Sequence, residues 1–212
     1  MLRYDLHTHT HFSSCSNMKP EILLKTAKKR GLDGIAVTDH GQIEGALEVK
    51  RLNKDKSFEV IVGQEISTMQ GDVLAYYVKE KIDAVDFFDA AEKARKQNAL
   101  VIIPHPFRTS LNPHHKFKIP LEKIKNKIDA VECFNARMLF NSDNKKADNA
   151  ANKHGIAKTG GSDAHFTFEV ATGQTWFEGN LRKALKEKKT KPYGRLKFGA
   201  FGGLLSFLRK RI

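Results

Sequence analysis

The sequence predicts an α/β fold built on a mainly parallel sheet, and two observations carry this prediction. Strand-like apolar runs alternate with helix-like stretches along most of the chain, and this alternation is typical of parallel sheets. One pair of apolar runs is separated only by Gly71-Asp72, a dipeptide typical of hairpin turns. We therefore expect one antiparallel excursion. The length of 212 residues suits a single domain with a sizeable core.

The apolar runs predict strands, and the stretches between them predict helices. Pro20 opens the first helix, where its missing N–H costs little, and Gly31 follows the end of that helix. The expected helices cover residues 20–30, 42–53, 84–97, 142–154 and 181–188. The expected strands cover residues 3–8, 34–38, 60–65, 73–77, 100–104, 130–135 and 157–161.

The charge of the chain is strongly basic and unevenly distributed. Lys and Arg number 37 against 24 Asp and Glu, which gives a net charge of +13. From Lys188 to Ile212 there are eight Lys or Arg and no acidic residue, so this segment supplies +8 and the remainder +5. A basic excess favours anionic partners, namely phosphorylated metabolites, nucleic acid or an acidic membrane surface, without choosing among them.

Two further features predict the compartment. No apolar run approaches the ~20 residues that a membrane-spanning helix needs, and the N-terminus lacks an apolar signal segment. Cys15 and Cys133 are the only cysteines, and two cysteines do not make a disulfide framework. We therefore expect a cytoplasmic protein without a transmembrane segment.

Polar side chains of metal-ligating type stand at the ends of the predicted strands. Because the C-terminal ends of the strands in a parallel α/β barrel converge on one face, these side chains are expected to meet there. Imidazole and carboxylate groups are ligands for Mn²⁺, Fe²⁺ and Zn²⁺. The residues are, strand by strand, His7 and His9; Asp39 and His40; Glu65; His105; Glu132 and Asn135; and Asp163 and His165.

The spacing within these motifs also fits ligation. Residues i and i+2 of a strand point the same way with Cα atoms roughly 6.5 Å apart, which suits the pairs His7/His9 and Asp163/His165. Asp39 points to the other face of an ideal strand, so it is better placed to orient a ligand than to bind metal. Each motif alone also fits a solvated strand or a rim ion pair, but their joint occurrence favours a metal site.

The remaining histidines have simpler interpretations. His11 continues the alternation into a loop and is expected at the rim of the pocket. His114 and His115 fall in a loop containing Pro and Asn and are expected in solvent. His154 precedes Gly155 at a helix C-terminus, where a partly charged imidazole suits the helix dipole.

The combined motifs resemble the polymerase and histidinol phosphatase (PHP) domain family. They are "DLHTHT…SS", "GLDGIAVTDHG", "VGQE", "PHPFR" and "GGSDAH", and the resemblance runs from about Leu2 to Glu178. It implies a distorted seven-stranded (β/α)7 barrel. It also implies two or three divalent metals, among Mn²⁺, Fe²⁺ and Zn²⁺, and hydrolysis of phosphoesters.

The resemblance also implies a ligand set, from which this chain departs at two places. Where the family commonly has Ser-Asp-Gly, this chain has Ser13-Ser14-Cys15, and it has Asp72 where many relatives carry a histidine. A third ion is therefore an open question, with Ser14, Cys15 and Asp72 as possible ligands and Glu132 as a possible ligand or supporting group. The implied ligands are His7, His9, His40, Glu65 as the bridging carboxylate, His105, Asp163 and His165.

The expected mechanism is attack on phosphorus by a hydroxide that bridges two metals, since metal binding lowers the pKa of water from 15.7 to about 7. Glu65 is the natural bridging group, and His40 or His165 is expected to protonate the leaving oxygen. Arg108, three residues after His105, is the first candidate for binding phosphate. Arg137, with Asn135 beside it, is the second.

Residues 1–190 are assigned to the barrel, and residues 191–212 to a basic tail. Phe198, Phe201, Leu205, Leu208 and Ile212 recur at the spacing of one helix face. We expect this amphipathic tail to dock on the barrel through that face. Contact with a nucleic-acid backbone and anchoring to a membrane surface are the alternatives.

The leading functional hypothesis is a metal-dependent phosphoesterase that acts on a small phosphorylated metabolite or a nucleotide. A nuclease acting on RNA or DNA ends is the second hypothesis. A catalytically inactive, nucleic-acid-binding barrel is the third, and hydrolysis of an amide or lactone stays open because fold alone does not choose the reaction. The sequence leaves the oligomeric state undetermined.

Overall fold

The computed structural model describes residues 1–109, 116–196 and 199–209. His114, His115, Phe198 and Ile212 lie outside the described residues. The strands are β1 (Leu2–Thr8), β2 (Gly34–Val37), β3 (Glu59–Thr68), β4 (Gly71–Tyr76), β5 (Leu100–Ile103), β6 (Ala130–Asn135), β7 (Ala157–Gly161), β8 (Gly173–Phe177) and β9 (Lys191–Gly194). The helices are α1 (Pro20–Lys29), α2 (Glu44–Leu52), α3 (Phe87–Lys96), α4 (Leu121–Ile124), α5 (Asn141–His154), α6 (Leu181–Lys186) and α7 (Gly199–Arg209).

Six of the seven strands from β1 to β7 run in the same direction. The order is β7-β6-β5-β4-β3-β2-β1-β8-β9. β1, β2 and β3 pair in parallel, and so do β5, β6 and β7. β4 lies between these two groups and is antiparallel to both β3 and β5. The two groups therefore run in the same direction as each other. The C-terminal ends of these six strands therefore lie at the same end of the sheet.

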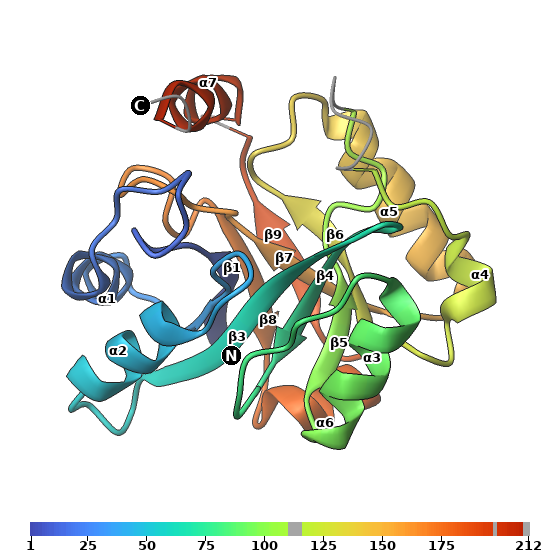
Figure 1. The fold of residues 1–212 in the computed structure, drawn as a ribbon, viewed down its shortest axis with the longest axis horizontal. Coiled ribbons are helices and arrows are strands. Elements are labelled where there is room, and N and C mark those ends of the chain that lie inside the picture. The colour runs from blue at the N-terminus through green and yellow to red at the C-terminus, as the bar shows by residue number, and fades with distance from the viewer. Residues whose placement is uncertain (110–115, 197–198, 210–212) are drawn as a thin grey trace.

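The sheet curls until its first and seventh strands meet. The Asp163 amide donates to the carbonyl of His7 at 2.8 Å, and the His9 amide donates to the carbonyl of Ala164 at 2.9 Å. β1 to β7 thus form a nearly closed barrel, with α1 and α2 against one side and α3, α4 and α5 against the other (Figure 1). β8 and β9 extend the sheet beyond β1.

Two apolar clusters stabilise the barrel. The larger joins the outer faces of the strands to the surrounding helices. The smaller takes side chains from all seven barrel strands, including Leu6, Ile61 and Ile102, and packs them against Leu181 of α6. The barrel interior below its C-terminal mouth is therefore a packed core, as in other parallel barrels.

The structure confirms the predicted α/β barrel class and corrects details. β8, β9 and α4 were not predicted, and their segments carry no clear apolar period. Gly71-Asp72 is not the hairpin turn: both residues belong to β4, and Thr68 pairs with Gly71 across a turn made by Met69 and Gln70. β9 pairs with β8, so the sheet extends past the boundary expected at residue 190.

The α7 helix of the basic tail presents a different face to the barrel from the one expected. The hydroxyl of Ser206 accepts a hydrogen bond from Nη2 of Arg137 at 2.9 Å, and Gly202 packs directly on the carboxylate of Glu169. Phe201 and Leu208, expected on the docked face, are 57% and 50% exposed. Small residues allow this close approach, whereas Phe and Leu at the same positions would hold the helix away.

Candidate metal centre

Potential metal ligands cluster at the C-terminal mouth of the barrel. Each group below brings ligand atoms within 4.8 Å of one another. Glu65, His7, His9 and His105 each belong to two groups, so the groups form one continuous cluster. The four groups are His7, His9 and Glu65; His7, His105 and Asp163; Glu65, Asp72 and His105; and His9, His40 and His165.

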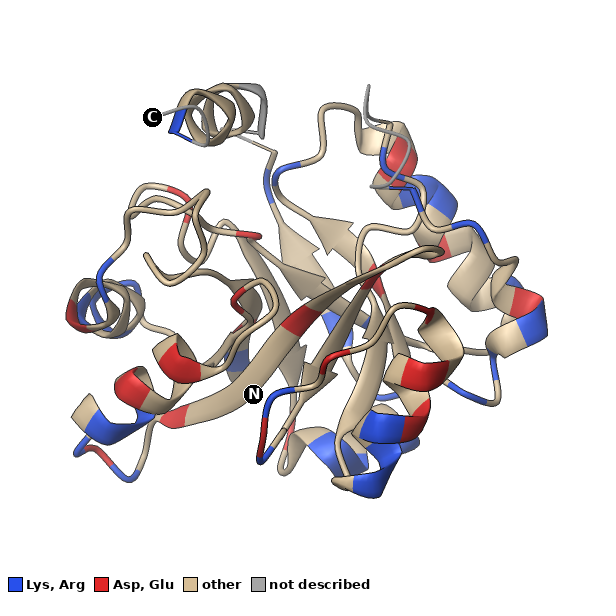
Figure 2. Cartoon of the chain, in the orientation of Figure 1, with Lys and Arg blue, Asp and Glu red and all other residues tan. Residues whose placement is uncertain are grey.

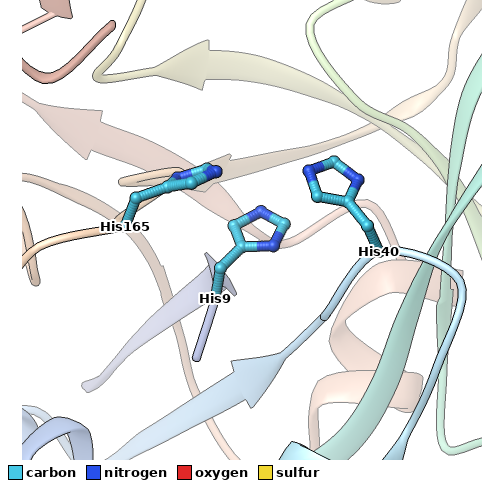
Figure 3. Close-up of side chains that lie close together, drawn as sticks. All are labelled: His9, His40 and His165. Carbon is cyan, nitrogen blue, oxygen red and sulfur yellow. The ribbon is translucent and has the colours of Figure 1, made fainter. Parts of the chain in front are cut away.

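The group of three histidines is seen in Figure 3, where His9, His40 and His165 point toward one another from three separate segments. His9 follows β1, His40 follows β2 and His165 follows β7. The ring centroids of His9 and His165 are 4.3 Å apart, and those of His9 and His40 are 4.7 Å apart. The ends of three different strands therefore bring these histidines together.

Glu65 lies at the centre of the cluster. Its Oε2 is 3.4 Å from Nε2 of His7, 3.3 Å from Nε2 of His9 and 3.3 Å from Nδ1 of His40. Its Oε1 is 3.4 Å from Nε2 of His105. One carboxylate thus has four imidazoles around its two oxygens, so potential ligands for a cation lie beside each oxygen.

Glu132 orients His7 from behind. Oε1 of Glu132 is 3.0 Å from Nδ1 of His7, so Nε2 of the same ring faces Glu65. Oε2 of Glu132 accepts from the backbone N–H of His105 at 3.0 Å and from Nδ2 of Asn135 at 2.9 Å. A carboxylate behind a ligating histidine fixes the tautomer and the orientation of the ring.

A β-bulge makes this support possible. The pairing of β6 with β7 shifts register between Glu132 and Phe134. In a regular strand, Glu132 and Asn135 would point to opposite faces because side chains alternate. The extra residue places both on the mouth side, where they bond each other. β1 has a similar shift between Asp5 and Thr8, at the strand that carries His7.

Asp39 connects the first two ligand loops by hydrogen bonds. It accepts from the backbone N–H of Thr10 at 2.7 Å, from the Thr10 hydroxyl at 2.6 Å and from the Ser13 hydroxyl at 2.6 Å. Ser13 in turn accepts from the backbone N–H of His40 at 3.0 Å. Asp39 therefore positions the loops of His9 and His40, and it belongs to none of the ligand groups among the described residues.

Two of the ligands have an unusual backbone conformation. His105 has φ +29° and Asp163 has φ +57°, in the region that favours glycine. Each is the second residue after the end of a strand, β5 for His105 and β7 for Asp163. Such strain persists where the surrounding structure imposes it, and it is concentrated at functional sites.

The carboxylates and imidazoles of the cluster alter one another's ionisation. Burial alone raises the pKa of Glu65 and of Asp163, but nearby imidazoles, His40 for Glu65 and His7 for both, outweigh burial and hold each pKa well below its usual value. Burial, and then the Arg137 guanidinium, hold the pKa of His165 well below its usual value. Ionised carboxylates and a neutral imidazole are the forms that bind cations.

Asp72, one of the two departures from the family pattern, is within the cluster. It shares a ligand group with Glu65 and His105. Burial, and then the Glu65 charge, raise the pKa of Asp72 to about 6. Ser14 at the other departure is exposed, and Cys15 is buried and belongs to none of the ligand groups among the residues that the structure covers. Asp72 thus offers a carboxylate oxygen to the cluster where many relatives carry a histidine, whereas the Ser14 side chain is outside the ligand groups of the described residues.

The three residues expected to bind phosphate occupy different positions. Arg108 is at the rim, 24% exposed, with Nη1 3.8 Å from Oδ2 of Asp163. Arg137 is buried and its Nε is 3.1 Å from Oε1 of Glu169. Asn135 is fully buried: its Nδ2 donates to Glu132 and to Asp163, and its Oδ1 accepts from the backbone N–H of Arg137. Both N–H groups of Asn135 are therefore already used within the cluster.

Sequence reasoning missed three positioning residues. Asp5 accepts from the backbone N–H groups of Ser162 and Ala171, both at 2.8 Å, and so fixes the segment before Asp163. Glu169 accepts from the backbone N–H of His165 at 2.8 Å. Ser13 links Asp39 to His40. Asp5 and Ser13 both stand in the motif "DLHTHT…SS", whereas Glu169 stands in none of the quoted motifs.

The residues of the cluster fit divalent cations. Nε2 of His9 and Nδ1 of His105 are buried atoms for which the described residues supply no hydrogen-bond partner. Buried polar atoms are rarely left without a partner unless an ion or water completes them. The potential metal ligands in these groups are imidazoles and carboxylates, with no thiolate among them, and this set suits Mn²⁺, Fe²⁺ or Zn²⁺.

The fold and the site together define a class: α/β barrels that gather potential metal ligands at the C-terminal mouth. Comparison with known families agrees, because the family model described as the PHP domain matches residues 5–187. The chain therefore belongs to the PHP domain family. The expectation raised by the sequence motifs is confirmed.

Two relatives come from Methanocaldococcus jannaschii. The uncharacterized protein MJ0417 is 34% identical over 189 residues, which is 86% of this chain and 73% of that protein. The uncharacterized protein MJ1587 is 32% identical over 146 residues, which is 64% of this chain and 82% of that protein.

Solved structures share the fold. A two-domain protein from Bacteroides vulgatus, described as containing a predicted PHP-like metal-dependent phosphoesterase, superposes with a TM-score of 0.77 at 22% identity, over 92% of this chain and 65% of that one. Endonuclease Q in complex with a 27-mer duplex superposes with a TM-score of 0.63 at 19% identity, over 88% of this chain and 56% of that one.

Proposed function

We propose that this protein is a metal-dependent phosphoesterase that hydrolyses a phosphoester of a small metabolite or a nucleotide. The observation that carries the proposal is the position of Glu65, whose two oxygens have four imidazoles within 3.4 Å at the barrel mouth. His7, His9, His40, Glu65, His105, Asp163 and His165, with Asp72, would hold two or three divalent cations. A cation held by these residues would lower the pKa of a bound water toward neutrality and would neutralise charge on the phosphoryl oxygens.

The residues around the mouth favour an anionic substrate. Arg108 stands at the rim beside Asp163 and also lines a cavity of about 750 Å³. Lys116, Lys118 and Lys146 line the same cavity. A guanidinium at this position binds a phosphoryl group through two parallel hydrogen bonds. The lysines provide positive charge for the part of the substrate that extends away from the reacting centre.

His40 is the histidine best placed to serve the leaving oxygen. Its side chain is 35% exposed, whereas His165 is 5% exposed. A group that hands a proton to a departing oxygen must lie within hydrogen-bond reach of it. Since the substrate enters from the solvent side, His40 meets this condition, and His165 is held behind it by Arg137.

The test combines metal analysis of the purified protein with a panel of phosphoesters. The panel contains nucleoside monophosphates, bisphosphates, histidinol phosphate and single-stranded oligonucleotides. We expect bound Mn, Fe or Zn and metal-dependent phosphate release from a small phosphoester. Glu65→Ala is expected to abolish turnover and to leave the chain folded, while Glu80→Gln, at an exposed carboxylate, leaves both unchanged. Near wild-type turnover by Glu65→Ala with full metal loading would refute the mechanism.

A nuclease is the second candidate. The likeness in fold to endonuclease Q and the net charge of +13 support it. Phosphate or nucleotide release from the oligonucleotides alone, with no turnover of the small phosphoesters, would favour the nuclease.

A further inference from the structure

Helix α7 leaves its large apolar side chains in solvent. Phe201, Leu204, Phe207 and Leu208 are 57%, 55%, 51% and 50% exposed. At 3.6 residues per turn these four positions fall within about 120° of the helix circumference. They form one continuous apolar strip, which we call the α7 strip.

The opposite face of α7 is seated on the barrel. Gly202 lies on the Glu169 carboxylate, and Ser206 accepts a hydrogen bond from Arg137. Nε of Arg209 donates to the carbonyl of Ser16 at 3.0 Å. These contacts fix the orientation of the helix, so the α7 strip faces outward as a consequence of how the helix docks.

Basic residues flank α7 in the sequence. Of the eight basic residues from Lys188 to Ile212, two stand shortly before α7, one ends it and two follow it, and the segment has no acidic residue; these five are Arg195, Lys197, Arg209, Lys210 and Arg211. Figure 2 shows α7 without any acidic position and with a basic residue at its end. An apolar helix face with basic residues before and after it in the sequence matches the surface of an anionic membrane, where apolar side chains enter the acyl boundary and cations meet the headgroups.

We propose that the α7 strip binds anionic lipid surfaces and makes this protein a peripheral membrane protein. No helix among the described residues is long and apolar enough to cross a bilayer, so the helix lies in the plane of the interface. Four exposed Phe and Leu side chains favour lipid over nucleic acid, because contacts to a phosphate backbone come from charged and polar groups. This inference does not depend on the proposed phosphoesterase activity.

The experiment measures binding of the full chain to vesicles by co-sedimentation. One set is phosphatidylcholine with about 30% phosphatidylserine, and the other is phosphatidylcholine alone. We expect binding to the anionic vesicles at least about tenfold tighter than to the neutral ones. We also expect it to weaken as salt rises from about 0.1 to 0.5 M, because exposed charges are then screened.

A double variant isolates the apolar strip. Leu204→Gln with Phe207→Gln is expected to weaken binding to anionic vesicles at least about tenfold, with an unchanged thermal melting curve because both side chains are exposed. The matched control is Val85→Gln with Phe88→Gln, an exposed pair at the start of α3, on the far side of the molecule from α7 (Figure 1). The control is expected to bind like wild type.

Several outcomes would overturn the proposal. They are absence of binding to anionic vesicles, equal binding to both vesicle types, and wild-type binding by the Leu204→Gln, Phe207→Gln variant. A dimer in light scattering that this variant dissociates would instead assign the strip to a second copy of the chain. Salt-sensitive capture of a duplex oligonucleotide, with no vesicle binding, would assign the segment to nucleic acid.

Discussion

His7 illustrates how single residues determine the centre. Its Nδ1 is held by Glu132 and its Nε2 faces Glu65. His7 is fully buried, so the ring has no freedom to turn toward solvent. Burial lowers the pKa of His7, but Glu132, Asp163 and Glu65 outweigh it and raise that pKa well above its usual value. Metal binding at this ring therefore displaces a proton.

Glu132→Gln tests this support. The amide retains the size of the side chain but loses the charge that fixes the His7 ring. We expect metal affinity to fall about 10–100-fold, measured by metal content after dialysis, with the fold retained. Glu122→Gln, at an exposed position of α4, is the control. Unchanged metal content in Glu132→Gln would contradict the positioning role.

The backbone of Asp163 allows a second comparison. At φ +57° an alanine is strained by about 1–2 kcal/mol, whereas a glycine is not. Both Asp163→Gly and Asp163→Ala remove the carboxylate. We expect the glycine variant to be more stable by about 1 kcal/mol in urea unfolding with chelator present. Equal stability of the two variants would mean that the loop relaxes to another conformation.

Arg108 determines substrate affinity in our proposal. Arg108→Ala is expected to raise KM for a phosphomonoester about 10- to 100-fold, since one charge-assisted pair is worth about 1.5–3 kcal/mol. Metal content should not change. Arg51→Ala on α2, which is exposed, is the control. A lower metal content in Arg108→Ala would indicate instead that Arg108 supports Asp163.

At the scale of elements, the closeness of β7, β8 and β1 determines the shape of the mouth. A Cβ added to Gly173 of β8 would overlap the carbonyl oxygen of Gly161 in β7. A Cβ added to Gly161 would lie 2.5 Å from Cβ of His7. Because Gly161 and Gly173 have no side chains, β7 can approach both β1, which carries His7, and β8.

Gly173→Ala is therefore expected to be strongly destabilising. Because the overlap is with backbone, the strands must separate, and we expect a loss of about 3 kcal/mol or more in the free energy of unfolding. Gly203→Ala is the matched control, because an added Cβ meets nothing within 4 Å and the residue is helical. It is expected to stabilise by up to about 1 kcal/mol. Denaturant unfolding measures both.

At the scale of the whole molecule, the centre joins distant parts of the chain. Its potential ligands lie within β1, β3 and β4 or follow β1, β2, β5 and β7. A cation bound there stabilises only the folded chain, because the unfolded chain does not bring these groups together. Stability and metal loading are therefore linked.

Chelation is expected to lower Tm. At a metal concentration 100 times Kd the stabilisation is about 2.7 kcal/mol, and each kcal/mol shifts Tm by about 2–4 °C at this size. We therefore expect a loss of about 5–10 °C with a chelator, reversed by Mn²⁺ or Zn²⁺. Glu65→Ala serves as the control, with a smaller shift. A Tm that does not respond to chelator would argue against cations at the cluster.

Local patterns in the sequence determined the barrel class and most of the cluster. Apolar alternation marked the seven barrel strands, and the polar residues that follow them supplied the ligands. The i, i+2 spacing was enough to pair His7 with His9, because strand geometry is local. Family motifs added the bridging position of Glu65 and the two departures from the ligand pattern.

Only the tertiary structure decided the rest, because it depends on contacts between residues far apart in the chain. The bulge in β6 turned Asn135 toward Glu132, which strand alternation alone excludes. Asp72 was expected in a hairpin turn, but it lies in β4 beside Glu65 and His105. The docked face of α7 was selected by the fit of Gly202 and Ser206 to the barrel, so the face that hydropathy favoured for burial remained in solvent.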